Sequence, residues 1–127
     1  MDNRKEYAVR LKHEGRNCAQ AVLAACADVL LVPVETLDKI GACFGVGMGC
    51  MEATCGALCA AEVVQGLKNF EGRPLLRDAA SVCKTFEQQC GGTICKVLKG
   101  VGTGTVLCEC DDCVRHAIET LEEKGIV

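Results

Sequence analysis

Apolar side chains recur every three to four residues along most of this chain, which is the spacing of one face of a helix. The first such run, residues 4–14, ends at Gly15. A second begins at Asn17, where the side chains of Asn17 and Gln20 predict a capping box, and it is expected to continue to about residue 30. Further helices are predicted over residues 34–43, 54–68, 75–90, 93–99 and 112–124. We therefore predict an all-α, single-domain bundle of about five to seven short helices spanning residues 1–127.

One segment near the middle, residues 45–49, interrupts the helical pattern with three alternating glycines. It lacks the Lys-Ser/Thr pair and the preceding strand of a phosphate-binding loop. We expect a glycine-rich loop whose backbone closely approaches a buried centre or another helix.

Charge and hydropathy exclude several classes of function. The net charge is −3, and no basic stripe interleaved with aromatic residues is present, so nucleic acid is not an expected partner. The charged first ten residues do not resemble a signal peptide, and no apolar stretch reaches the roughly 18 residues of a membrane span. We expect a cytoplasmic protein that does not enter a membrane.

Twelve cysteines in 127 residues dominate the candidate chemistry. In a secreted chain they would indicate a disulfide framework, but in a reducing cytosol they indicate metal ligands or redox thiols. Their positions relative to the predicted helices narrow the choice.

Four predicted helices begin with a capping residue and a cysteine within two positions of it. The capping residues are Asn17, Thr54, Thr93 and Asp112, and the cysteines are Cys18, Cys55, Cys95 and Cys113. A helix N-terminus offers unpaired N–H groups and partial positive charge, which favour the thiolate. Four such ends that converge would suit an anionic cluster such as Fe4S4. We therefore expect these four cysteines to be the ligands of a metal centre.

The remaining cysteines and the histidines are weaker candidates. Further metal ligands could come from Cys50, Cys59, Cys108 and Cys110. Together with Cys113, the last two form a local run that could bind Zn with another pair, or cycle as a dithiol. We expect Cys26, Cys83 and Cys90 to pack as small apolar residues. His13 and His116 are expected at the surface, with His116 as a reserve ligand. Haem attachment is excluded, because Val114 follows Cys113 where a histidine is required.

Several motifs occur in an order that resembles a known prokaryotic family of redox-active proteins. The motifs are residues 17–22 (NCAQAV), 45–49 (GVGMG), 55–58 (CGAL), 66–68 (GLK) and 93–95 (TIC), followed by Cys113 and the closing helix. The family is named for one cysteine, a CGAxxG-type motif and two further cysteines (the C_GCAxxG_C_C pattern). The resemblance implies that Cys18, Cys55, Cys95 and Cys113 are its characteristic cysteines.

The same resemblance implies a redox-active protein with an iron–sulfur group, and a similar domain occurs in dimeric split-haem cytochromes. This chain departs from the pattern at Ala60, where the motif has its last glycine, and in eight additional cysteines that include Cys43 and Cys50. The extra thiols could enlarge the metal site or add a second one.

Three functions stay open at this stage. The first is electron transfer through an iron–sulfur centre, which requires a redox partner protein. The second is storage or trafficking of Cu(I), which prefers soft thiolates, and the third is metal-free thiol–disulfide exchange. Catalysis on a substrate has the least support, since no acid–base pair accompanies the thiols. A homodimer is expected, with the Ala-rich helix 18–30 or 55–68 at its interface.

Overall fold

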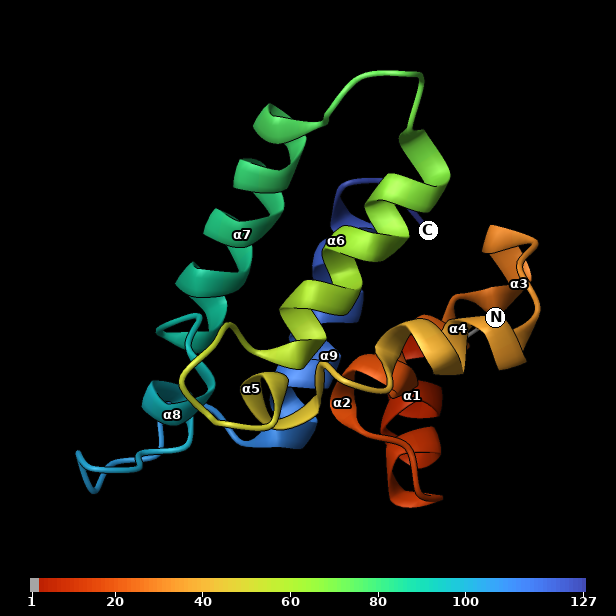
Figure 1. Cartoon of the computed structure of the whole chain (residues 1–127). Helices are drawn as coiled ribbons and strands as arrows, with labels where there is room; N and C mark the ends of the chain where they lie inside the picture. Colours follow the sequence, from red (N-terminus) through yellow and green to blue (C-terminus); the bar gives the residue numbers. More distant parts are fainter. Residues whose placement is uncertain (1–2) are drawn as a thin grey trace.

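A computed structural model describes residues 3–127 and shows an all-helical fold (Figure 1). In this range the helical segments are α1 (Arg4–His13), α2 (Cys18–Ala25), α3 (Ala27–Leu30), α4 (Val34–Gly41), α5 (Gly45–Met48), α6 (Gly56–Asn69), α7 (Leu76–Cys90), α8 (Cys95–Leu98) and α9 (Cys110–Glu123). Extended pairing within these residues is limited to one isolated antiparallel bridge, between Thr54 and Ile94. No helix among them has the length and apolar character needed to cross a membrane.

Helix α2 is the central element of the fold. It packs against α1, α4, α6 and α9, and all its residues except Gln20 are buried. The helices α6, α7 and α9 contact one another and form the other half of the molecule (Figure 1). One cluster of mostly aliphatic side chains runs through both halves. The chain itself covers most of α2, whereas α6 has exposed residues near its C-terminal end.

The prediction of five to seven helices was too low, and one reason lies at Cys26. The second predicted helix is divided there into α2 and α3, because Cys26 has non-helical dihedral angles (φ −103°, ψ 4°). The N–H of Val29 bonds to the carbonyl of Cys26 instead of that of Ala25. The buried guanidinium of Arg4 donates to the freed Ala25 carbonyl at 2.6 Å. An arginine from another helix therefore stabilises the break.

The other additional helical segment is α5, within the glycine-rich residues. It is one turn with left-handed backbone at Val46 (φ 55°) and Gly47 (φ 56°), followed by positive φ at Met48 and Gly49. The predicted open loop is thus a tight left-handed turn. Its Gly45 and Gly47 make close contacts that a side chain would prevent.

Candidate metal centre

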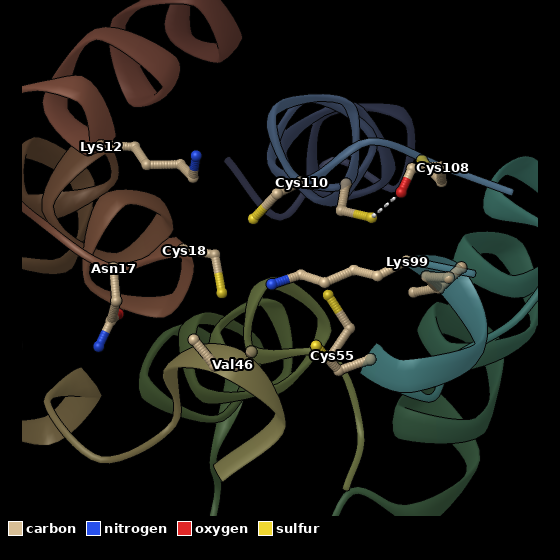
Figure 2. A pocket seen from close by; sticks show the side chains of 12 residues that line it. Lys12, Asn17, Cys18, Val46, Cys55, Lys99, Cys108 and Cys110 are labelled. Carbon is tan, nitrogen blue, oxygen red and sulfur yellow. Dashed lines mark hydrogen bonds between the residues drawn. The ribbon is translucent and has the colours of Figure 1, made fainter. Parts of the chain in front are cut away.

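Six cysteines line one cavity of about 270 Å³ where several helix termini meet. They are Cys18, Cys55, Cys95, Cys108, Cys110 and Cys113. The structure therefore brings together all four cysteines selected at predicted helix starts and two of the four weaker candidates. Lys12 and Lys99 also line this thiol cavity, and Figure 2 shows both reaching toward the sulfur atoms.

The bridge between Thr54 and Ile94 places two of these cysteines. The N–H of Cys55 donates to the carbonyl of Thr93 at 2.7 Å, and the N–H of Cys95 donates to the carbonyl of Ala53 at 3.1 Å. These backbone bonds hold the start of α6 against the start of α8. Side chains 40 positions apart in the sequence thus reach the same cavity.

The helix starts differ in part from the predicted ones. The capping box of Asn17 and Gln20 is confirmed, with the Gln20 N–H donating to Asn17 Oδ1 at 2.8 Å and the Asn17 N–H donating to Gln20 Oε1 at 3.0 Å. The expected caps at Thr54, Thr93 and Asp112 were wrong: the N-cap residues of α6, α8 and α9 are Cys55, Ile94 and Glu109, without a side-chain cap bond. The backbone around Thr54 and Thr93 is used for the bridge instead.

Helix α9 begins earlier than predicted, which changes the position of its cysteines. Its first residue is Cys110, so Cys113 lies at the end of the first turn. The Cys113 thiol donates to the carbonyl of Cys108 at 3.8 Å (dashed line in Figure 2). The short segment from Cys108 to Cys113 therefore presents three thiols to the cavity.

The cavity thiols form a row in which each thiol shifts the pKa of its neighbours. Cys18 interacts with Cys110 and Cys55, and Cys55 interacts in turn with Cys113. The thiol of Cys113 also interacts with Cys90 and Cys108. Cys95 lies apart from this row, at the start of α8.

Interactions among the thiols outweigh the lowering of their pKa values that we expected from the helix N-termini. The contact with Cys113 raises the pKa of Cys55 to about 12, and burial adds to the rise although the contact with Cys18 opposes it. The contact with Cys110 lowers the pKa of Cys18, but the contact with Cys55 and burial outweigh it, so this pKa is raised. The backbone of Ala57, in the first turn of α6, does lower the pKa of Cys55 as expected, but the effects of Cys113 and of burial outweigh it in the metal-free chain. Metal binding has to displace protons.

Gly56 lines the cavity, and the nearby Gly45 and Gly47 also pack closely against their neighbours. A Cβ on Gly56 would lie 2.7 Å from Cys18 Sγ and 2.5 Å from the Phe44 carbonyl oxygen, and one on Gly47 would lie 2.7 Å from Cys95 Cβ. A Cβ on Gly45 would lie 2.6 Å from Asn17 Cβ. The close backbone approach predicted for the glycine-rich segment is therefore found at Gly47, next to the candidate ligand Cys95.

The two lysines add positive charge to a cavity that is otherwise lined by thiols and apolar groups. Lys12 Nζ forms an ion pair with Asp111 Oδ1 at 2.8 Å. The ammonium of Lys99 extends toward the sulfur atoms of Cys18 and Cys55 (Figure 2). Its charge lowers the pKa values of Cys95 and Cys110, although burial of Cys95 and the contact of Cys110 with Cys18 leave both raised. Sequence spacing gave no signal for either lysine, because each reaches the site from a different helix.

Other candidates lie outside the cavity wall. Cys50 is exposed and donates to the Gly47 carbonyl at 3.4 Å, while the half-buried Cys59 donates to the Thr54 carbonyl at 3.9 Å. Cys26 is buried, as expected of a packing residue, and burial raises its pKa to about 12.

The spacing of the metal-ligating atoms identifies one group suited to a single ion. Two thiolates on one Zn²⁺ lie no more than about 4.6 Å apart, twice the Zn–S distance. Among the described residues, one trio of Cys, His, Asp or Glu ligand atoms lies within 4.8 Å, and it consists of Cys90, Cys108 and His116. No three of the cavity thiols meet that criterion.

The comparisons agree with this cysteine-centred description. The sequence model of a family described as "Putative redox-active protein (C_GCAxxG_C_C)" matches residues 16–124. In comparisons with curated proteins and with solved structures, no significant match was found. The matched range contains all the cavity cysteines and one Cys/His group with the spacing of a metal site. The chain therefore belongs to the redox-active protein family with the C_GCAxxG_C_C cysteine pattern.

Proposed function

We propose that this chain transfers electrons through an iron–sulfur cluster held in the thiol cavity. The observation that carries the proposal is the set of six cysteines around one cavity of about 270 Å³. Cysteine thiolates are the usual ligands of such clusters. The proposed ligands are Cys18, Cys55, Cys95 and Cys113, each from a different helix start.

The cavity fits this group in shape and charge. Gly56 and Gly47 pack so closely against Cys18 and Cys95 that a side chain at either position would displace these thiols. Four thiolates carry negative charge into a largely buried volume, and the ammonium groups of Lys12 and Lys99 oppose it. When bound, the cluster would supply one-electron chemistry. The residues of the chain would hold it, limit its exposure and set its electrostatic environment.

A redox partner protein, a cytoplasmic location and a homodimer are further parts of the same proposal. An electron carrier needs a protein that donates or accepts electrons, and we propose such a redox partner. The twelve cysteines are all free, which suits the reducing cytoplasm. We also propose a homodimer, with the exposed part of α6 around Leu67 as its interface.

Cu(I) storage is the second candidate function, because the row of contacting thiols offers several soft sulfur ligands close together. Metal-free thiol–disulfide exchange is the third, since the thiols of this row are free and adjacent. It has less support from the structure, because the raised pKa values of Cys18 and Cys55 disfavour the nucleophilic thiolate.

The test starts from the full-length chain, purified without oxygen. We expect a brown protein that contains iron and acid-labile sulfide and has a visible absorption band that bleaches on reduction. Single Cys→Ser changes at positions 18, 55, 95 or 113 should abolish or markedly weaken the colour. Cys83→Ser is the matched control, because this half-buried residue of α7 lies outside the cavity.

Two results would contradict the proposal. A protein that stays free of iron after reconstitution, yet binds several Cu(I) ions tightly, would support storage. Loss of the colour in Cys83→Ser but not in Cys113→Ser would show that the ligand set is wrong.

A further inference from the structure

A second group of metal-binding side chains lies beside the thiol cavity. Cys90 is the last residue of α7, Cys108 precedes α9, and His116 lies two turns into α9. Their ligand atoms all lie within 4.8 Å of one another. Cys90 and His116 are not part of the cavity wall, so the group extends away from the cavity on the α7 side.

Burial of this group makes it a defined site. The exposed fractions of Cys90 and Cys108 are 3% and 8%. The Nδ1 atom of His116 is buried and has no hydrogen-bond partner, although Glu119 Oε1 lies 3.1 Å from it. A buried polar atom without a partner is costly, and it often indicates an ion or water that completes the site.

We propose that Cys90, Cys108 and His116 bind one Zn²⁺ ion, at a site that adjoins the thiol cavity and shares Cys108 with its wall. Zn–S bonds of about 2.3 Å and Zn–N bonds of about 2.0–2.1 Å require ligand atoms no more than about 4.6 Å apart. The observed spacing within 4.8 Å is close to this limit, so small side-chain rotations bring all three atoms to one ion. Two thiolates and an imidazole form a ligand set that Zn²⁺ favours.

The three ligands leave the fourth position of a tetrahedral ion to a water molecule. The side chain of His116 is 32% exposed, which gives that position access to solvent. Cys113 lines the cavity, and its thiol donates to the carbonyl of Cys108 at 3.8 Å. We assign Cys113 to the cavity, and the zinc site then shares a boundary with it through Cys108.

The role of this ion is to fix a segment that the rest of the fold holds weakly. Residues 99–109 connect α8 to α9, and most of residues 101–107 are exposed. The backbone N–H groups of Leu107 and Cys108 both donate to the Leu98 carbonyl, at 3.0 and 3.2 Å. A metal bond at Cys108 would join the end of this segment to α7 and α9. It would thereby hold Cys108 and Cys110 at the cavity.

The test uses Co²⁺ as a spectroscopic substitute for Zn²⁺, on the full-length chain with Cys18→Ser and Cys55→Ser. These two changes remove cavity thiols but leave the proposed zinc ligands intact. We expect one equivalent of Co²⁺ to give the visible bands of a tetrahedral site with thiolate ligands, and one equivalent of Zn²⁺ to displace it. Adding His116→Gln or Cys90→Ser should weaken Zn²⁺ binding by at least about 100-fold, since even changes behind the ligands weaken binding 10–100-fold.

Controls separate this proposal from that of the iron–sulfur cluster. Cys83→Ser, on the same helix as Cys90, should leave Co²⁺ binding unchanged. In the otherwise unmodified protein, His116→Gln should remove one zinc per chain and leave the iron content as it is. Circular dichroism of each variant checks that the helices remain.

The proposal is overturned if His116→Gln and Cys90→Ser bind Zn²⁺ as tightly as the parent. It is also overturned if tetrahedral Co²⁺ bands appear with the cavity thiols intact but vanish with Cys18→Ser and Cys55→Ser, because the ion would then lie in the cavity. Failure of the iron assay with success of the cobalt assay would reject the cluster and retain the zinc site.

Discussion

Gly56 lies so close to Cys18 that a Cβ at position 56 would be 2.7 Å from Cys18 Sγ. The same Cβ would be 2.5 Å from the Phe44 carbonyl oxygen, so backbone as well as thiol would have to move. We expect Gly56→Ala to lower the free energy of unfolding by about 1–3 kcal/mol, the usual cost of overpacking. It should also displace Cys18 and reduce metal retention. Denaturant unfolding and metal analysis measure the two effects.

Gly66 is the matched control for this substitution, because it lies on the same helix and a Cβ there would meet nothing within 4 Å. Gly66→Ala should leave the metal content unchanged and raise the stability by about 0.4–1 kcal/mol. Equal losses in both variants would mean that Gly56 matters for the helix and not for the cavity.

Lys99 should raise the reduction potential of any centre in the cavity, because its positive charge favours the more negative, reduced state. A unit charge about 8 Å away contributes about 2 kcal/mol at an effective dielectric constant of 20, before screening by salt. We expect Lys99→Ala to lower the potential by tens of millivolts in a spectroelectrochemical titration. Lys96→Ala, at an exposed position of α8, should change it little. An unchanged potential in Lys99→Ala would place the reducible group away from the cavity.

Glu62 makes stability depend on pH. Burial raises its pKa to about 7, although the amide of Gln65 donates to it at 2.9 Å and opposes the rise. Since its pKa when unfolded is near 4.5, the folded chain holds this proton more tightly. Below about pH 4.5 the carboxyl is protonated in both states and does not lower the free energy of unfolding. Between about pH 4.5 and 7 its ionisation increasingly favours the unfolded state, so the free energy of unfolding falls as the pH rises.

Glu62→Gln should thus raise the melting temperature by a few degrees at pH 8 and much less at pH 4.5. Glu71→Gln, at an exposed position between α6 and α7, is the control and should show no such difference. A rise in melting temperature for Glu62→Gln that is the same at both pH values would contradict the raised pKa of Glu62.

The pair of Arg4 and Asp28 supports the break between α2 and α3. Arg4 is 7% exposed and donates to both carboxylate oxygens of Asp28, at 2.6 and 3.2 Å. Asp28→Asn leaves a buried guanidinium with a weaker partner, so we expect a loss of about 1–2 kcal/mol in denaturant unfolding at pH 7. Lys5→Gln, which removes a more exposed ion pair to Glu119, should cost less than about 1 kcal/mol.

The same pair adds a pH dependence at the acid end. The hydrogen bond from Arg4 lowers the pKa of Asp28. Its contribution to stability is therefore present above the unfolded pKa and is lost as the pH falls through the lower, folded value. The stability difference between the wild-type chain and Asp28→Asn should shrink below about pH 4.

Metal removal should destabilise the fold, because the bound metal would join four helix starts that enclose an otherwise open volume. We expect the stripped chain to melt at a lower temperature than the metal-loaded chain. Sedimentation of the two forms tests whether assembly changes as well. Equal melting temperatures would show that the metal does not contribute to folding.

Local patterns predicted much of this structure. Helical periodicity identified most helices, and the Asn17 capping box was found where residue types predicted it. The break at Cys26 could not be predicted, because it depends on Arg4, 21 residues away from the carbonyl that it contacts.

The same limit applies to the candidate site. Residue types near helix starts selected Cys18, Cys55, Cys95 and Cys113, and the fold brings them to one cavity. Cys90 was assigned to packing, because its own helix carries an apolar stripe. Its proximity to Cys108 and His116 arises from tertiary packing of α7 against α9, which no local pattern encodes.

The bridge between Thr54 and Ile94 joins main-chain atoms, and this determines which substitutions the site can tolerate. The bonds that position Cys55 and Cys95 involve the backbone carbonyls of Thr93 and Ala53, so they do not depend on the side chains at those positions. Relatives could therefore differ at residues 53, 54, 93 and 94 and still present the two thiols together.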